Sequence, residues 1–126
     1  MRRLISTGSP WETKVGYSRA VQVDNTLYVS ATASTDLTLD LYGQTRNALE
    51  LLEHVLRDNG FALTEVVSSR LVVSDFDSWE EAARAHGEVF AEVRPAFALV
   101  HALPFVDPAI LVEVELVAVR SVVGAG

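Results

Sequence analysis

The sequence predicts a single α+β domain, spanning residues 1 to 126, in which two helices cover one face of a mixed β-sheet. Three observations predict this class. Strand-like and helix-like segments alternate in the order β-β-α-β-α-β-β. Two segments repeat apolar residues at helical spacing, whereas the others alternate at the two-residue period of a strand or are rich in β-branched residues. The chain length of 126 residues is that of one domain.

Residues 19 to 33, RAVQVDNTLYVSATA, predict a β-hairpin near the N-terminus. Two strand-like runs flank Asp24 and Asn25, and these residue types tolerate the left-handed conformation that a tight hairpin turn requires. The segment around Trp11, which precedes the hairpin, has two interpretations. It is either a flap over a binding site or a packed terminus.

Two helices are predicted, one over residues 41 to 60 and one over residues 77 to 93. Gly60 stands where a left-handed residue ends a helix. Asp77 and Glu80 have the spacing of an N-cap and its partner in a capping box. The apolar stripe of the first helix consists of Leu41, Thr45, Ala48, Leu49, Leu52, Val55 and Leu56. The stripe of the second consists of Trp79, Ala82, Ala83, His86, Val89, Phe90 and Val93.

Three further strands are predicted, over residues 65 to 76, 97 to 103 and 110 to 120. The last strand has one face suited to packing under the helices, formed by Ile110, Val112, Val114, Leu116 and Ala118. Its other face mixes two carboxylates with apolar residues: Leu111, Glu113, Glu115, Val117 and Val119.

A large apolar patch is expected on that second face, because we also assign Phe97, Leu99 and Leu103 to it. Such patches usually mark an interface. Apolar residues make up 49% of the chain, which is rich for so short a sequence and favours burial between subunits.

The composition excludes several classes of protein. A net charge of −7 with scattered basic residues argues against binding to nucleic acid. No apolar run is long enough for a membrane span, and no signal peptide is recognisable, so we expect a cytoplasmic protein that does not bind membranes. The absence of cysteine excludes disulfides and thiol nucleophiles.

No common catalytic motif is present, and we expect neither a metal nor a cofactor. The three histidines, at positions 54, 86 and 101, lack the spacing of metal ligands. His86 lies on a helical core stripe and is interpreted as a buried histidine with a hydrogen-bond partner. His101 is expected on a strand beside Glu113 and Glu115, where it is either an acid-base group or half of a structural ion pair.

Several blocks of sequence, in order and at the right separations, carry a family resemblance: VGYSRAVQVDNTLYVSATAS, YGQTRNALELLEHVLRDNG, EVVSSRLVVSDFDSWEEAARAHGEVF, RPA and VDPAILVEVELVAV. Together they resemble the Rid/YjgF family of reactive intermediate deaminases, formerly described as L-PSP endoribonucleases. The resemblance covers nearly the whole chain. It implies a chorismate-mutase-like fold, a homotrimer whose bare sheet faces form a central barrel, and active sites in the clefts between subunits.

The resemblance also implies site residues, with one departure. Family deaminases hydrolyse imines and enamines such as 2-aminoacrylate, and the arginine of a Pro-Ala-Arg-Ser segment holds the substrate carboxylate. This chain has Phe97 and Ala98 in place of that arginine and serine. The family's site tyrosine and its water-positioning glutamate match Tyr17 and Glu113. The serine and glycine of its SGQ segment match Ser30 and Ala31, so the glycine is replaced.

These residues lead to a divergent Rid-like hydrolase as the favoured interpretation, with a substrate other than 2-aminoacrylate. Glu113 is expected to position water or move a proton, with Tyr17 and His101 as further catalytic candidates. Phe97, Ala98, Ser30, Ala31 and Trp11 are expected to contact a small ligand of apolar or aromatic character. Arg19 is the candidate replacement cation, although a structural pairing is an alternative. The rival interpretation is a non-catalytic trimer that binds a metabolite or a partner protein.

Overall fold

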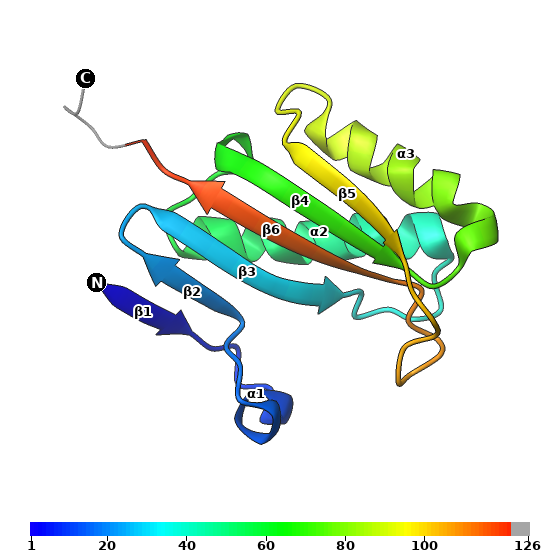
Figure 1. Cartoon of the computed structure of the whole chain (residues 1–126), viewed down its shortest axis with the longest axis horizontal. Helices are drawn as coiled ribbons and strands as arrows, with labels where there is room; N and C mark the ends of the chain where they lie inside the picture. Colours follow the sequence, from blue (N-terminus) through cyan, green and yellow to red (C-terminus); the bar gives the residue numbers. More distant parts are fainter. Residues whose placement is uncertain (122–126) are drawn as a thin grey trace.

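The computed structural model describes residues 1–121 and contains one six-stranded sheet with two long helices on one face (Figure 1). This confirms the predicted α+β class. The strand order across the sheet is β1-β2-β3-β6-β4-β5. The strands are β1 (Arg2–Ile5), β2 (Ala20–Val23), β3 (Thr26–Ala33), β4 (Val66–Val73), β5 (Ala96–His101) and β6 (Val112–Val119). The helices are α1 (Pro10–Val15), α2 (Leu41–Asp58) and α3 (Trp79–Phe90), with short 3₁₀ turns at Leu63–Glu65 and Phe76–Ser78.

Two N-terminal elements, β1 and α1, were not predicted. The four residues of β1 include two arginines and show no apolar alternation, so the strand exists because it pairs antiparallel with β2. Helix α1 has only six residues, too few for a periodic pattern. It is defined by Pro10 in its first turn and by Ser9, whose side chain accepts a hydrogen bond from the Trp11 amide.

The predicted hairpin and first helix are confirmed. Asp24 adopts a φ of 50° at the β2–β3 turn, which is the left-handed conformation expected there. Helix α2 begins after Asp40, whose side chain accepts from the Gly43 amide at 2.8 Å. It ends at Asp58, and Gly60 follows with a φ of 82°.

The predicted capping box of the second helix is wrong. Asp77 belongs to the 3₁₀ turn at Phe76–Ser78, and α3 begins one residue after that turn. The N-cap of α3 is therefore Ser78, which makes no side-chain capping bond. Residue spacing alone could not show that the chain tightens into a 3₁₀ turn before the helix starts.

The hydrophobic core lies between the helices and the inner face of the sheet. The predicted inward residues of the last strand, from Val112 to Ala118, are at most 1% exposed. They contact a set of buried residues from α2 and the neighbouring strands, which includes Leu27, Leu49, Leu52, Leu56 and Leu71. Within residues 1–121, no helix has the length and apolar character to cross a membrane.

The expected face and neighbour of β5 are both wrong. Strand β5 pairs in parallel with β4, whereas β6 lies between β3 and β4. Ser69 on β4 is level with Leu116 on β6 and with Phe97 on β5, so these three side chains share the inner face. Leu99 follows Phe97 on that face, and Leu103 lies beyond the strand. The error arises because adjacency in sequence suggested a β5–β6 hairpin, whereas β6 inserts at the centre of the sheet.

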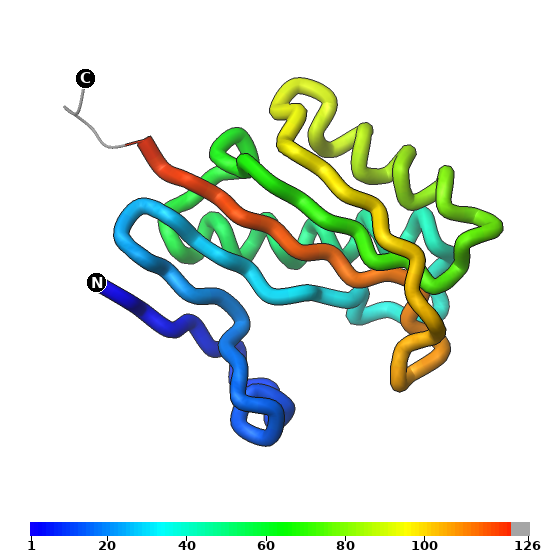
Figure 2. The backbone as a smooth tube through the Cα atoms, in the orientation of Figure 1, coloured from blue at the N-terminus to red at the C-terminus, as the bar shows by residue number. Residues whose placement is uncertain are grey.

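The outer face of the sheet carries no helix (Figure 1). Figure 2 shows β1 and β5 at opposite edges and the loop after β5 reaching beyond the end of the sheet before the chain returns as β6. The outward residues of β3, β4, β5 and β6 include Tyr28, Arg70, Val100, Glu113, Glu115 and Val117. Two of them, Tyr28 and Val100, are large hydrophobic side chains exposed to 51% and 39%.

Candidate functional site

A β-bulge in β3 forms the backbone of the candidate site. Val29 is level with Leu116 on β6, and the next paired residue, Thr32, is level with Val114. Ser30 and Ala31 therefore both stand opposite a single residue of β6. Such a bulge bends the strand and takes backbone groups out of the regular ladder, and bulges are frequent next to functional sites.

Arg19, which immediately precedes β2, binds this bulge with its side chain. Its Nη1 donates to Thr32 Oγ1 at 2.6 Å, to the Ala31 carbonyl at 3.1 Å and, at the limit of 3.5 Å, to the Ser30 carbonyl. The Ser30 hydroxyl donates to the Ser18 carbonyl at 2.6 Å. The side chains of Arg19 and Ser30 thus hold the bulge in place, and the same hydrogen bonds hold the Arg19 guanidinium.

Tyr17 completes this cluster on the N-terminal side. The Arg19 guanidinium lies over the Tyr17 ring, with its central carbon 5.8 Å from the ring centroid, a cation–π arrangement. The chain turns into this region through Gly16, which ends α1 with a φ of 86°. Tyr17, Arg19, Ser30 and Ala31, four of the predicted site residues, therefore gather at one place.

Glu113 lies on β6 beside this cluster. It is level with Ala33 on β3 and with Val72 on β4, just past the bulge. Burial raises the pKa of Glu113, the positive charge of Arg19 opposes that rise, and the charge of Glu115 adds to it. Within residues 1–121 the carboxylate has no hydrogen-bond or ion-pair partner. Glu113 is therefore a half-buried acid that can exchange a proton with a bound molecule.

The remaining predicted site residues lie elsewhere in the same chain. Phe97, Ala98 and His101 are on β5, which is separated from the bulge by β6 and β4. The Phe97 ring stacks against His86, with centroids 4.5 Å apart. Trp11 lies on α1, is 60% exposed, and has the Lys14 amino group 5.4 Å from its ring centroid.

The expected contact between His101 and a carboxylate is wrong. His101 is level with Val73 on β4 and so lies on the inner side of the sheet, whereas Glu113 lies on the outer side. Its ring stacks on Phe76, with centroids 4.6 Å apart. The mistaken pairing of β5 with β6 produced this expectation.

The interpretation of His86 as a buried, hydrogen-bonded histidine is confirmed. His86 is 8% exposed, and its Nε2 lies 2.7 Å from the Ser69 hydroxyl oxygen. Burial lowers the pKa of His86 and keeps the ring neutral. Ser69 was missed as its partner, although alternation with the inward Leu71 and Val73 indicates that it points toward the helices.

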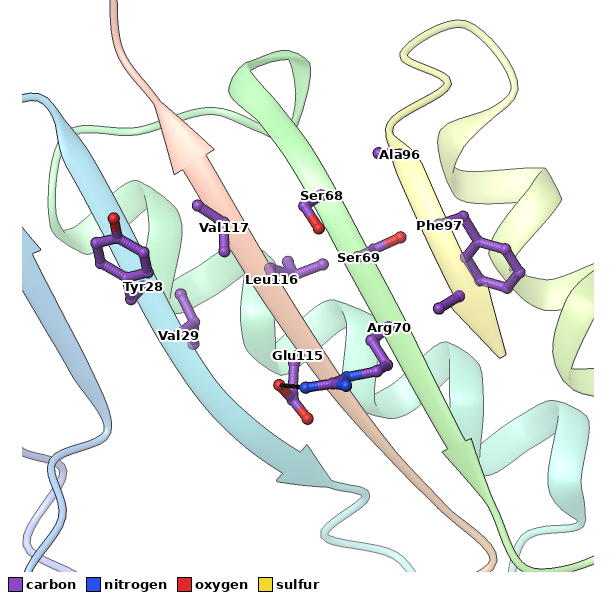
Figure 3. A pocket seen from close by; sticks show the side chains of 11 residues that line it. Tyr28, Val29, Ser68, Ser69, Arg70, Ala96, Phe97, Glu115, Leu116 and Val117 are labelled. Carbon is purple, nitrogen blue, oxygen red and sulfur yellow. Dashed lines mark hydrogen bonds and ion pairs between the residues drawn. The ribbon is translucent and has the colours of Figure 1, made fainter. Parts of the chain in front are cut away.

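The described residues also form a hollow on the outer face of the sheet, and no residue of this cluster lines it. It has a volume of about 400 Å³ and crosses the outer face from Tyr28 on β3 to Ala96 on β5 (Figure 3). Arg70 and Glu115, the charged residues in its lining, bind each other at 3.1 Å. The lining includes neither Glu113 nor Tyr17. With its charges paired and its walls largely apolar, the hollow has the character of a docking surface.

No group of three or more potential metal-binding side chains occurs among residues 1–121. The cluster around the bulge contains one carboxylate, one guanidinium, one phenol and backbone groups.

Comparison with known proteins gives three consistent matches. The family model described as Endoribonuclease L-PSP matches residues 8–120. The uncharacterized protein SCO2049 of Streptomyces coelicolor is 30% identical, covering 96% of this chain and 94% of its own. The 3-aminoacrylate deaminase RutC of Acinetobacter baylyi is 31% identical, covering 81% and 85%.

Solved structures agree with this match. The crystal structure of Rv2704 from Mycobacterium tuberculosis, described as a member of the YjgF/YER057c/UK114 family, has a TM-score of 0.88. It is 35% identical, and the match covers 95% of this chain and 100% of that one.

Proposed function

The chain belongs to the Endoribonuclease L-PSP family, which is also the YjgF/Rid family, and from this premise we propose that it hydrolyses or tautomerises an imine or enamine. The observation that carries the proposal is Glu113, which lies beside the β-bulge of Ser30 and Ala31 without a partner among residues 1–121. The name of the relative from Acinetobacter baylyi, a 3-aminoacrylate deaminase, supports enamine chemistry.

Glu113 acts first as a general base in the proposed hydrolysis. Its carboxylate takes a proton from a water molecule as the water oxygen attacks the imine carbon, and the C=N electron pair moves to the nitrogen, which gains a proton. In the resulting carbinolamine the hydroxyl proton passes to the nitrogen, the C–N bond breaks to release ammonia, and the C=O bond forms. One water is consumed, and one ketone or keto acid and one ammonia are produced. A carboxylate with a raised pKa suits both proton transfers near neutral pH.

The other residues of the cluster position the substrate in this scheme. The Ser30 amide already donates to the Arg19 carbonyl at 3.0 Å. The Ala31 amide is therefore the proposed backbone donor that polarises the reacting group, and Tyr17 is a further hydrogen-bond donor within the cluster. An enamine follows the same route after protonation at carbon converts it into the imine.

The complete site in this proposal is a cleft between subunits of a homotrimer. The separation of Phe97 and Ala98 from Glu113 within one chain supports this arrangement, because a second subunit can supply its β5 edge to the cleft. The exposed apolar side chains on the outer face of the sheet support association through that face. Trp11 is the proposed mobile wall of the cleft.

The substrate in this proposal is not 2-aminoacrylate. Phe97 stands where family deaminases hold a carboxylate with arginine, and its exposed ring suits an apolar or aromatic substituent. Cleavage of RNA is disfavoured, because the net charge of −7 opposes binding to a polyanion.

The test is ammonia release from imines generated in situ by an amino-acid oxidase acting on several amino acids. The protein should accelerate release, and Glu113→Gln should lower that acceleration by roughly a hundredfold or more while the trimer persists. Glu50→Gln on the exposed side of α2 is the charge-matched control and should retain full activity. Unchanged turnover in Glu113→Gln would remove Glu113 from the mechanism.

A second candidate function is a non-catalytic trimer that binds a metabolite or a partner protein. It is favoured by Phe97, since the ring replaces the one arginine that anchors substrate in the deaminases. Ligand-induced shifts in melting temperature without ammonia release would support this candidate over catalysis.

A further inference from the structure

The guanidinium of Arg19 is only partly used within its own chain. All of its hydrogen bonds in residues 1–121 are made by Nη1, which leaves Nη2 and Nε without protein partners there. Arg19 is half-buried, yet no buried side-chain nitrogen or oxygen of the described residues lacks a partner. The Nη2 and Nε atoms must therefore reach solvent. Together they carry three N–H donors in a planar fork, which is the group that binds a carboxylate in bidentate fashion.

The charge of Arg19 is also uncompensated in the described residues. The arginines at positions 46, 57, 70 and 84 each bind a glutamate. Arg19 forms no ion pair among residues 1–121, and it shares this with the arginines at positions 2, 3, 94 and 120. The carboxylate that its charge affects is that of Glu113, and even these two groups do not bind each other. Arg19 and Glu113, both half-buried, thus lie near each other without forming an ion pair.

The position of the free edge is fixed rather than mobile. Thr32 Oγ1 and the Ala31 carbonyl hold Nη1 at 2.6 and 3.1 Å, and the central guanidinium carbon lies 5.8 Å from the centroid of the Tyr17 ring. A donor fork held in this way loses little conformational freedom when a ligand binds. A role in holding the bulge explains the hydrogen bonds of Nη1. It does not explain why Nη2 and Nε are held in place without protein partners in residues 1–121.

We propose that Arg19 binds the carboxylate of the substrate through Nη2 and Nε, so that the adjacent imine carbon is held at Glu113. This inference rests on the proposed function and names its substrate class: imines of 2-oxo acids with a bulky apolar or aromatic side chain. The carboxylate lies at Arg19, and the side chain extends toward the Phe97 edge of the neighbouring subunit. Arg19, the proposed anchor of the carboxylate, and Glu113, the proposed acid-base group, thus belong to the same chain.

The proposal is tested by binding of phenylpyruvate, the 2-oxo acid that hydrolysis of the phenylalanine imine would release, against its methyl ester. Titration calorimetry on the purified protein should show that the acid binds more tightly than the ester by roughly ten- to a hundredfold, the value of hydrogen bonds to a charged group. Arg19→Met should reduce binding of the acid to the level of the ester and leave the ester unchanged. Arg57→Met, which removes the same charge from an exposed position on α2, should bind like the wild type.

Two further measurements keep the test decisive if Arg19→Met does not fold. The wild-type preference for acid over ester needs no variant. Arg19→Lys keeps the charge and can reach the bulge but lacks the donor fork, so it should lose most of the preference. Wild-type protein that binds neither compound, or binds both equally, would overturn the proposal, as would an Arg19→Met variant that keeps the preference. Selective binding of the acid without ammonia release would instead uphold Arg19 as the anchor and reject the enzymatic function.

Discussion

Arg70 and Glu115 face each other across β4 and β6, with Nη2 and Oε1 3.1 Å apart, whereas Glu113 on the same face of β6 has no such partner within residues 1–121. The Arg70–Glu115 pair is partly exposed and contributes little to stability, about 0 to 1 kcal/mol. The pair occupies Glu115, one of two neighbouring glutamates, whereas Glu113 has no ion-pair partner among residues 1–121. Glu113 and Glu115 therefore differ in their surroundings, although their spacing on the strand makes them look equivalent.

The first prediction concerns the pH dependence of stability at Glu113. Burial raises its folded-state pKa above the ordinary value of 4.5, so the folded protein binds the proton more tightly than the unfolded chain does. The stabilisation from that proton is complete below the ordinary pKa and is lost as pH rises through the raised value. Glu113→Gln should therefore raise the free energy of unfolding at about pH 8 and raise it less at about pH 4.

Urea unfolding at fixed protein concentration measures this difference. Glu115→Gln is the matched control, since it removes the same charge from the same face but breaks the ion pair with Arg70. It should give no gain at the higher pH. An equal effect of Glu113→Gln at both pH values would mean that burial does not perturb this carboxylate.

The second prediction concerns substrate choice. The protein should hydrolyse 2-aminoacrylate poorly, because this small enamine has no side chain to contact the Phe97 ring. Imines derived from leucine or phenylalanine should react faster, and Phe97→Ala should reduce that advantage by roughly tenfold. The measurement is the rate of 2-oxo acid formation above the uncatalysed rate. A 2-aminoacrylate rate equal to those of the larger imines would contradict the prediction.

The third prediction concerns the hydrogen bond between Ser69 and His86. Ser69→Ala leaves the buried His86 Nε2 without a partner and should lower the free energy of unfolding by about 1 to 3 kcal/mol. Adding His86→Phe, which places a third aromatic ring beside Phe90 and Phe97, should recover part of that loss. Chemical denaturation of the wild type, both single variants and the double variant gives the coupling energy. Additive effects would show that the two side chains do not interact.

The fourth prediction concerns assembly through the outer face of the sheet. Light scattering should give a mass of about three times 13.7 kDa. Val100→Asp places a charge on the outer face and should dissociate the trimer, since burying an unpaired charge costs several kcal/mol. His54→Asp on the exposed side of α2 should leave the mass unchanged. A wild-type monomer at micromolar concentration would refute both the trimer and the cleft between subunits.

The sequence was sufficient to predict those features that depend on local periodicity. The stripe of α2, the Asp24 turn and the inward residues from Val112 to Ala118 were each predicted and found. Order along the sheet was not accessible in this way, because strand pairing depends on contacts distant in sequence. This is why β5 was paired with β6 and why Phe97, Leu99 and His101 were assigned to the wrong face.

The candidate site was predictable in its members but not in its geometry. The resemblance indicated Tyr17, Ser30 and Glu113, and the structure brings Tyr17 and Ser30 together with Arg19 beside Glu113. The bulge that aims Ser30 and Ala31 has no signature in a run of small residues such as YVSATAS. It becomes visible only as a break in the register between β3 and β6.

Because of that break in register, a mutation can alter the site without altering the core residues of the fold. Leu27, Val29 and Thr32 all point inward, and removing one codon, that of Ala31, would return β3 to regular alternation with the same core residues. Such a deletion variant should keep the circular dichroism spectrum of the parent and lose the acid-over-ester preference, because the carbonyls that fix Arg19 would be displaced. Evolution could thus remove or restore the site by deleting or inserting a single codon, without any change in the residues that form the core.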